Sequence, residues 1–293
     1  MKQKFRDYSI VDKVFRVVLF LVMLFLSLTY IFMFVWIFAN SLRTSSEFLI
    51  NTFDIFDFDK YTFENYKVLF NTQIAGSQRN PVYLMDTIWN TVVLVFGQVL
   101  LGITIPALSG YIVAKYQFKA RKVLNGVALL QLIVPTIGTL ATTYSLMTTF
   151  ELTNTFLGIF LMNAGGFGFS FLLFKNFFSV IPWSYAESAF LDGASDFRVF
   201  VSIMYPQSVP ILTAIAVTTF IAAWNDYFTA YIYLPARPTI SLAVSQLYTK
   251  MSNRMQLPVA FAGMSLLALV SLGVFGIFNK FIMTNLSAGG LKG

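Results

Sequence analysis

The sequence contains no cysteine and no histidine, and charged residues make up only 11% of it. Without thiols or imidazoles the chain cannot form disulfides, haem or imidazole–metal sites, or a catalytic Ser–His–Asp or Cys–His arrangement. Soluble domains carry about 25% charged residues, whereas this chain is 57% hydrophobic and 17% aromatic. The composition therefore predicts a membrane protein.

The chain also lacks a G-x-x-x-x-G-K-[ST] phosphate-binding loop. Its glycine-rich end, Gly289–Gly293, has no strand and helix around it to supply the dipole that binds an anion. The one acidic cluster, Asp54, Asp57 and Asp59, alternates with apolar residues, which is more typical of a solvated loop edge than of a Mg²⁺ or Ca²⁺ site. We therefore expect no catalytic, cofactor-binding or metal site and no ATP hydrolysis in this chain.

Six apolar runs are each close to the roughly 20 residues that a helix needs to cross a bilayer. They span residues 17–38, 86–114, 123–148, 155–178, 206–234 and 259–283. None shows the alternating segments of about ten residues that are typical of a membrane β-barrel. The first run is too long for a signal peptide and lacks a small-residue cleavage pattern. We expect an all-α integral membrane protein with about six transmembrane helices.

The distribution of charge between alternate loops predicts the orientation. With the amino terminus inside, 13 of the 20 Lys and Arg residues lie in inner segments and 7 in outer ones. Five acids lie inside and seven outside, which leaves the inner side at +8 and the outer side at 0. Because Lys and Arg are retained on the cytoplasmic side, we expect a multi-pass cell-membrane protein with both termini in the cytoplasm. Topology and contact with anionic membrane lipid explain the net charge of +7 without a nucleic-acid partner.

A polar segment separates the fourth apolar run from the fifth. Ser184, followed three residues later by Glu187, predicts a capping box at the start of a short helix. Gly193 suits the left-handed turn that ends a helix, and Ser195 or Asp196 can cap the next one. The sequence thus predicts a helix–turn–helix on the cytoplasmic surface. Capping chemistry alone leaves two alternatives open, a plain interfacial loop and a surface that a partner recognises.

Three parts of this segment resemble the E-A-A…G…I-x-L-P signature of permease subunits of ATP-binding cassette importers. They are Glu187-Ser-Ala189, Asp192-Gly-Ala194 and Ile203-Met-Tyr-Pro206. Further segments resemble the sugar-importer branch, in particular the maltose-type second permease, in the order of that family. These segments are 41–47, 63–66, 90–91, 114–119, 224–226 and 289–293.

The chain departs from the family pattern at a few positions. Ser188 stands where the family has its central Ala, and Tyr205 stands where it usually has Leu before the proline. The tail has Gly290-Leu291 where the family usually has Ala-Val. The acidic residue, the turn glycine and the proline of the signature are all present.

The resemblance implies a type I importer permease fold with cytoplasmic coupling helices. It divides the chain into a first segment, 1–85, with a cytoplasmic tail, one membrane helix and an outer loop. A five-helix core follows at 86–283, with the coupling loop at 182–206, and then a cytoplasmic tail at 284–293. The implied partners are a second permease, two cytoplasmic ATPases that bind ATP and Mg²⁺, and an extracytoplasmic substrate-binding protein.

The resemblance also implies roles for individual residues. The residues expected to couple to the ATPase are Glu187, Ser188, Ala189, Asp192, Gly193, Ala194, Arg198 and Pro206. Those in the outer loop that are expected to contact the binding protein are Ser241, Gln246 and Tyr248, although a plain surface connection there explains the sequence equally well. In this hypothesis the chain is half of a transporter for a sugar or oligosaccharide.

The substrate path is less evident from the sequence. Candidates for the path or for the permease interface are Asn90, Trp224, Asn225, Asp226 and Tyr227. Asp226 is an ionisable residue inside an apolar run, which favours a functional site, but it can instead bond to the partner permease or cap a broken helix. Asn90, Gln98, Gln131 and Asn163 are other polar residues in these runs, and such residues form hydrogen bonds between helices more often than they bind a solute.

The sequence leaves three other functions open. An ion-coupled secondary transporter usually places an ionisable pair at the membrane midplane and often shows internal repeats, and neither is evident. A membrane enzyme would need a catalytic constellation, for which a chain without His and Cys offers little. A permease for a solute other than a sugar is compatible with the same motifs.

Overall fold

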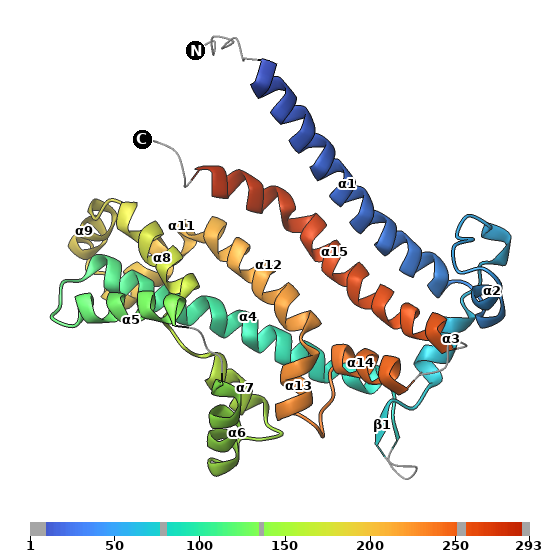
Figure 1. Ribbon diagram of the computed structural model, residues 1–293. Helices are drawn as coiled ribbons and strands as arrows, with labels where there is room; N and C mark the ends of the chain where they lie inside the picture. Colours follow the sequence, from blue (N-terminus) through green and yellow to red (C-terminus); the bar gives the residue numbers. More distant parts are fainter. Residues whose placement is uncertain (1–9, 77–80, 135–137, 251–255, 289–293) are drawn as a thin grey trace. The chain divides into compact units, whose positions relative to one another are not determined.

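The computed structural model describes residues 10–76, 81–134, 138–250 and 256–288, and most of them are helical (Figure 1). The chain divides into two compact units. One holds the residues up to Asn71 together with Tyr248–Ser265. The other holds Thr72–Leu247 together with the residues from Leu266 onward.

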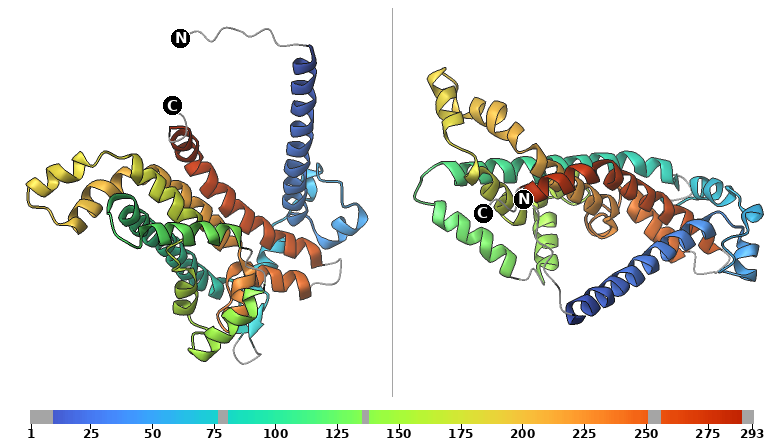
Figure 2. Two further views of the ribbon diagram at one scale, coloured as in Figure 1. Left: turned by 60° about the vertical axis from the view of Figure 1, so that its left-hand side comes forward. Right: turned by 90° about the horizontal axis from the view of Figure 1, so that it is seen from above.

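The first unit consists of a long helix and the small cap that follows it. Its elements are α1 (Ile10–Ser41), α2 (Ser45–Ile50), the 3-10 turn η1 (Phe58–Lys60), α3 (Glu64–Asn71), the end of α14 (Ile240–Lys250) and the start of α15 (Leu257–Ala288). The large apolar side chains of α1 are exposed around the helix over most of its length, and its long straight course is visible in Figure 2. A helix that is apolar on all sides suits a lipid or protein environment.

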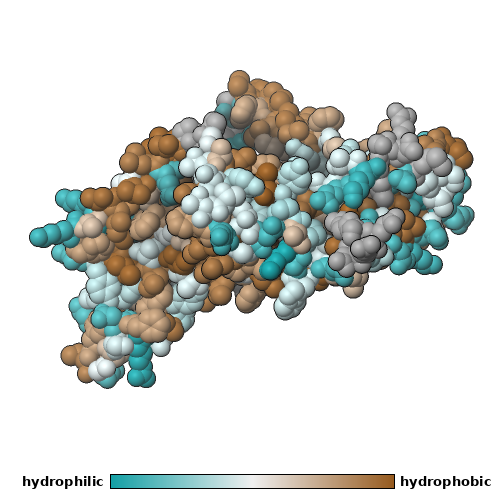
Figure 3. All heavy atoms as spheres, turned by 90° about the horizontal axis from the view of Figure 1, so that it is seen from below, coloured by the Kyte–Doolittle hydropathy of each residue, from teal (hydrophilic) through white to brown (hydrophobic). Residues whose placement is uncertain are grey.

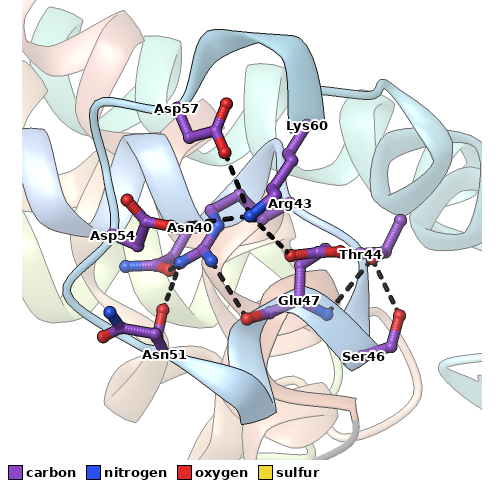
Figure 4. Close-up of polar contacts among 9 residues, drawn as sticks. All are labelled: Asn40, Arg43, Thr44, Ser46, Glu47, Asn51, Asp54, Asp57 and Lys60. Atoms are coloured by element: carbon purple, nitrogen blue, oxygen red, sulfur yellow. Dashed lines mark hydrogen bonds and ion pairs between the residues drawn. The ribbon is translucent and has the colours of Figure 1, made fainter.

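Arg43 holds the cap of the first unit together. Its side chain is completely buried and reaches three oxygen acceptors (Figure 4). The guanidinium donates to the Asn40 side-chain oxygen (3.1 Å) and to the main-chain carbonyls of Asn51 (2.7 Å) and Glu47 (3.0 Å). The two carbonyls lie at the carboxyl end of α2, where the backbone dipoles favour a cation. One buried cation thus ties the end of α1 to the loop that follows it.

The acidic residues of the cap surround Lys60. Its ammonium lies 3.0 Å from Asp57, 3.3 Å from Glu47 and 3.6 Å from Asp54. Hydrogen bonds that the Lys60 ammonium donates to Asp57, and secondly to Glu47, raise the pKa of Lys60 above its ordinary value. Asp54 and Asp57, two of the three clustered aspartates, therefore contribute to the fold of the loop, which agrees with the structural role predicted for them.

The second unit is built around one long helix with shorter ones beside it. Its elements are β1 (Ala75–Gly76), β2 (Pro81–Val82), α4 (Leu84–Lys115), α5 (Arg121–Ile133), α6 (Thr139–Thr149), α7 (Phe156–Asn163), α8 (Phe169–Val180), α9 (Ser184–Leu191), α10 (Asp196–Val199), the π-helical turn η2 (Phe200–Met204), α11 (Tyr205–Gln207), α12 (Val209–Asn225), α13 (Tyr227–Tyr233), most of α14, and α15 from Leu266 onward. The two strands form one short antiparallel pair.

Helix α4 packs most extensively against α8 and then against α12, and the three lie side by side in Figures 1 and 2. Gly110 allows α4 and α8 to approach closely. A Cβ atom at this position would lie 2.9 Å from the Lys175 amide nitrogen and 2.9 Å from the Phe174 Cβ, which is closer than packed atoms tolerate.

Three of the six predicted membrane helices are not continuous. The runs 123–148, 155–178 and 206–234 are split between α5 and α6, between α7 and α8, and between α12 and α13. Gly138 and Gly168 have positive φ values of 90° and 149°, which glycine adopts and other residues rarely do. At 1.5 Å per residue, the 13 residues of α5 are too short for a core about 30 Å thick. The prediction of single helices is wrong for 123–148 and 155–178, whereas the break in 206–234 is one of the alternatives that the sequence left open for Asp226.

Within the described part of the chain, three helices are long and apolar enough to cross a membrane: Ile10–Ser41, Leu84–Lys115 and Leu257–Lys280. The bent pair Asp196–Gln207 and Val209–Asn225 raises this number to four if it is one span. Hydrophobic residues form several patches among hydrophilic ones on the face drawn in Figure 3. The prediction of a helical membrane protein is confirmed.

We expect Gly110→Ala to destabilise the second unit by about 1–3 kcal/mol, because the added methyl group overpacks the contact between α4 and α8. Gly126→Ala is the matched control, since nothing described lies within 4 Å of a Cβ at that helical position. It should leave stability unchanged or raise it by about 1 kcal/mol. Thermal unfolding of the purified protein in detergent measures both effects. Equal midpoints for the two variants would contradict the close approach at Gly110.

Candidate functional site

The connection between α9 and α10 is a tight turn at Gly193, as predicted. Gly193 has a φ of +80°, in the left-handed region that favours glycine. Its N–H donates to the Phe190 carbonyl (3.0 Å), and the Ala194 N–H donates to the Ala189 carbonyl (2.9 Å). These two bonds form a Schellman motif, which satisfies the free carbonyls at a helix end. Nothing described lies within 4 Å of a Cβ at Gly193, so backbone conformation rather than space requires glycine here.

The start of α9 differs from the prediction. Trp183 is the N-cap residue and its side chain makes no capping bond, while Ser184 already belongs to the helix. The predicted capping box of Ser184 and Glu187 is therefore wrong. The Trp183 ring packs against Tyr116 (5.8 Å between centroids) and Phe190 (6.0 Å), and this anchoring starts the helix one residue earlier. The Glu187 side chain remains exposed.

The second helix of the turn begins at Ser195, whose hydroxyl accepts a hydrogen bond from the Arg198 N–H (3.4 Å). Of the two caps that the sequence allowed, the structure therefore uses Ser195. The helical stretch Asp196–Gln207, which includes Pro206 near its end, meets Val209–Asn225 at an angle of 76°. The turn is thus continuous with a sharply bent helix pair.

One face of this helix–turn–helix packs into the unit to which it belongs. Ala186, Val199 and Met204 are completely buried in an apolar cluster with residues of α4 and α8. Ala189 and Ala194 are half-buried and pack against the same cluster. Both alanines lie in the segments that resemble the permease signature, and here they lie at the inner face of the loop.

The opposite face is open and combines apolar with charged groups. The fractional exposure of Leu191 is 90%, that of Phe197 is 72% and that of Tyr185 is 52%. The polar side chains exposed beside them are Glu187, Ser188, Asp192 and Arg198. Sequence reasoning missed the three apolar members. Helical spacing could have found Leu191, because it lies three and four residues after Ser188 and Glu187 and shares their face.

The end of α4 fixes the loop in place. The Lys115 ammonium donates to the Ile181 carbonyl and lies 6.0 Å from the centre of the Trp183 ring. The Tyr116 hydroxyl donates to an Asp196 carboxylate oxygen. Burial, and secondly the bond with Asp196, raise the pKa of Tyr116 above its ordinary value. The loop is attached to α4 on both sides of its turn.

Asp226 lies at the break between α12 and α13. Its carboxylate accepts a hydrogen bond from the Thr229 N–H (3.0 Å) and caps α13. Of the alternatives for Asp226, the cap of a broken helix is therefore confirmed. The same side chain lines a hollow of about 490 Å³.

Three of the other candidates for the solute path form side-chain hydrogen bonds within the chain. The Trp224 indole donates to a carbonyl of α15 (3.2 Å), and the Asn225 amide donates to a serine hydroxyl of α15 (2.9 Å). The Asn90 amide donates to a main-chain carbonyl just before α14 (3.1 Å). Tyr227 is about half exposed. The structure does not gather these candidates around one cavity.

Two polar residues that were expected to join helices do not. Among the described residues, the Gln98 side chain has no hydrogen-bond partner, although only 9% of the residue is exposed. The Asn163 amide donates to the Ile159 carbonyl of the same helix, one turn earlier (2.9 Å). The prediction of hydrogen bonds between helices is wrong for both.

The predicted binding-protein contacts lie on the short helix α14. Ser241 is only 4% exposed and donates to the Asn225 carbonyl (3.0 Å), so it presents no surface to another protein. The Gln246 side-chain oxygen is buried and has no partner among the described residues. Tyr248 is about half exposed.

Comparison with known proteins identifies a family. Residues 102–289 match the model of the binding-protein-dependent transport system inner membrane component. A maltodextrin transport system permease protein of Bacillus subtilis is 30% identical over 275 residues, which cover 90% of this chain and 95% of the relative. One from Streptococcus pneumoniae is 32% identical over 235 residues, which cover 79% of this chain and 80% of the relative.

A further relative is an arabinooligosaccharides transport system permease protein of Bacillus subtilis, 26% identical over 284 residues, with 96% of this chain and 97% of the relative covered. Among solved structures, a bacterial ABC transporter involved in the import of the acidic polysaccharide alginate is similar with a TM-score of 0.73. It is 18% identical, and the match covers 94% of this chain and 99% of that one. The fold is therefore that of an ABC importer permease, as the motifs predicted.

We expect Asp226→Ala to weaken the start of α13 by about 1 kcal/mol, because the capping bond to the Thr229 amide is lost. Hydrogen exchange of that amide should accelerate by about five-fold, which corresponds to this free energy. Asp226→Asn is the control, since Asn caps helices about as well as Asp. Equal protection in the Ala and Asn variants would show that the cap does not stabilise the break.

Proposed function

The chain belongs to the family of inner membrane components of binding-protein-dependent transport systems, and we propose that it forms half of the translocation path of an ATP-driven oligosaccharide importer. The observation that supports this proposal best is the two-faced loop at 184–205. Its inner face is buried in its own subunit, while its outer face exposes Leu191 and Phe197 beside charged groups. Such a surface, with apolar side chains inside a polar rim, is typical of a protein interface.

In this proposal the outer face docks into one of two cytoplasmic ATPase subunits, which bind ATP and Mg²⁺. Leu191 and Phe197 supply the buried centre of the interface, and Glu187 bonds polar or basic groups at its rim. Both termini of the chain then lie in the cytoplasm, as the charge distribution favours. A second permease completes the path, and an external binding protein delivers the solute.

The attachment of the loop to α4 supports a mechanical role. Lys115 and Tyr116 bond to main-chain and side-chain oxygens on either side of the turn. A movement of the ATPase surface is therefore transmitted to α4 without bending the loop, and α8 and α12 are packed on α4. Alternating access then follows from rigid-body rotation of this helical core.

The solute class rests on the relatives. Their names give maltodextrin and arabinooligosaccharides as transported solutes, and both are neutral oligosaccharides. We assign a solute of the same kind to this chain. ATP-dependent uptake of such a sugar by membranes that contain the complete transporter tests the function, and uptake that persists after ATP depletion would contradict it.

Gly193→Val should reduce transport to less than about a tenth of the wild-type rate, because a β-branched residue is strained at positive φ. The distorted helix end would misplace Leu191 and weaken binding of the ATPase subunit. Gly193→Asn is the control, since Asn tolerates the left-handed conformation. Uptake and co-purification of the ATPase are measured together, with size-exclusion chromatography to verify that the membrane part stays folded. Full transport by the Val variant would contradict the proposed coupling role.

Leu191→Asp should lower ATPase binding by about ten-fold or more, the size of effect expected at the centre of an interface. The side chain is almost fully exposed in this chain, so the substitution should leave the stability of the chain unchanged. Leu191→Met preserves the apolar contact and serves as the control. Titration of purified ATPase onto the permeases in nanodiscs gives both affinities. Equal affinities for the two variants would place the interface elsewhere.

A further inference from the structure

A polar hollow lies in the second unit, away from the helix–turn–helix. It has a volume of about 490 Å³ and is lined by residues of α4, α7 and α12 and by Asp226 at the helix break. A second hollow of about 270 Å³ shares Gln98, Asn163 and Thr219 with the first and is bordered by Phe167 and Phe169. The larger one is within the range of about 300–1,000 Å³ that is usual for small-molecule sites.

The side chains around the hollow have unused hydrogen-bonding capacity. Neither the Gln98 amide nor the Thr219 hydroxyl has a hydrogen-bond partner among the described residues. The Asn163 amide nitrogen donates to a carbonyl of its own helix, which leaves its oxygen available. One Asp226 carboxylate oxygen caps α13, which leaves the other oxygen available as an acceptor. Donors and acceptors from four segments of the chain therefore converge on one space.

The unpartnered groups differ from the polar groups near them. Gln98 is only 9% exposed, yet its amide atoms still reach solvent, because they are not among the buried side-chain atoms without a partner. Trp224, Asn225 and Asn90 have hydrogen-bond partners within the chain, whereas Gln98 and Thr219 do not. The Gln98 amide and the Thr219 hydroxyl are therefore the groups to which a ligand with several hydroxyls would bond.

The charge of the hollow selects the ligand further. No Lys or Arg is among the residues that line either space, and Asp226 is the only acidic one. An anionic solute would meet a carboxylate and no compensating cation in the lining, which is unfavourable. A neutral, hydroxyl-rich solute meets only donors and acceptors, and the exposed Phe169 ring offers an apolar surface for the face of a sugar.

We infer that this hollow is a subsite for one neutral sugar unit during passage, in contact with Gln98, Asn163, Thr219 and Asp226. The inference rests on the proposed function as an oligosaccharide permease. It assigns direct solute contact to this subunit, and it excludes acidic sugar chains at this step.

The first test uses the complete transporter in proteoliposomes with saturating, sugar-loaded binding protein. Thr219→Val and Gln98→Leu remove hydrogen-bonding groups at nearly constant size. Each should reduce the number of maltotriose molecules imported per ATP hydrolysed by about two- to ten-fold, the effect of one lost hydrogen bond. Thr213→Val is the matched control, because Thr213 also lies on α12 but does not line the hollow. It should import as many molecules per ATP as the wild type.

The second test exploits the absence of cysteine from this chain. Thr219→Cys places a single thiol in the hollow, and Thr213→Cys places one outside it. Without binding protein, maltotriose should slow maleimide labelling at position 219 by about two-fold at half occupancy, and an alginate trisaccharide should not. Labelling at position 213 should respond to neither sugar.

The inference is overturned by two results together: maltotriose leaves labelling at position 219 unchanged, and Thr219→Val and Gln98→Leu import as many molecules per ATP as the wild type. Sugar uptake by the wild type in that case leaves the proposed function intact. Loss of the second permease from these variants also overturns the inference, since the hollow would then hold a side chain of that subunit. Protection by the acidic trisaccharide overturns the assignment of a neutral solute. Absence of ATP-dependent oligosaccharide uptake by the wild type is the separate outcome that refutes the proposed function.

Discussion

The need to satisfy every main-chain hydrogen-bonding group away from water governs this protein. In lipid, an interruption of a helix is tolerated only where other groups of the protein replace the missing bonds. At the break between α12 and α13 the Asp226 carboxylate accepts a hydrogen bond from the Thr229 amide. Between α7 and α8 the Ser109 hydroxyl of α4 donates to the Gly166 carbonyl (2.7 Å). The helix interruptions therefore require polar side chains within an apolar chain. The hollow lies where the interruption between α7 and α8 meets the one between α12 and α13.

The coupling loop satisfies a different pair of requirements. It must stay attached to its own helices and yet present a surface to another protein. Small residues such as Ala186 and Ala189 let the loop pack closely on α4 and α8, and the Schellman motif at Gly193 turns the chain without extra residues. Leu191 and Phe197 are thereby directed outward. Rigid attachment on one face and exposure on the other are what a transmitting element needs.

The structure also changes which polar residues are relevant to the solute. The aromatic and amide-rich group at 224–227 was the natural candidate from sequence, since it surrounds a carboxylate in an apolar run. Its indole and amide groups are used within the chain to hold α12 against α15. Gln98 lies on α4, far from Asp226 in sequence, whereas Thr219 precedes Asp226 on α12. The packing of α4 on α12 brings Gln98 to the same space.

The sequence alone determined the membrane class, the family and the turn at Gly193, because composition, motif order and glycine conformation act locally. It left Ser195 and Asp196 as alternative caps of the next helix, and the structure uses Ser195. It could not determine where α9 starts, because the packing of Trp183 on Tyr116 and Phe190 overrides the local capping signal at Ser184. It also overestimated the unbroken helices, since hydropathy does not register a glycine with positive φ. Only the tertiary structure decided which polar groups are used within the chain and which remain open, because hydrogen-bond partners and burial depend on contacts between segments distant in sequence.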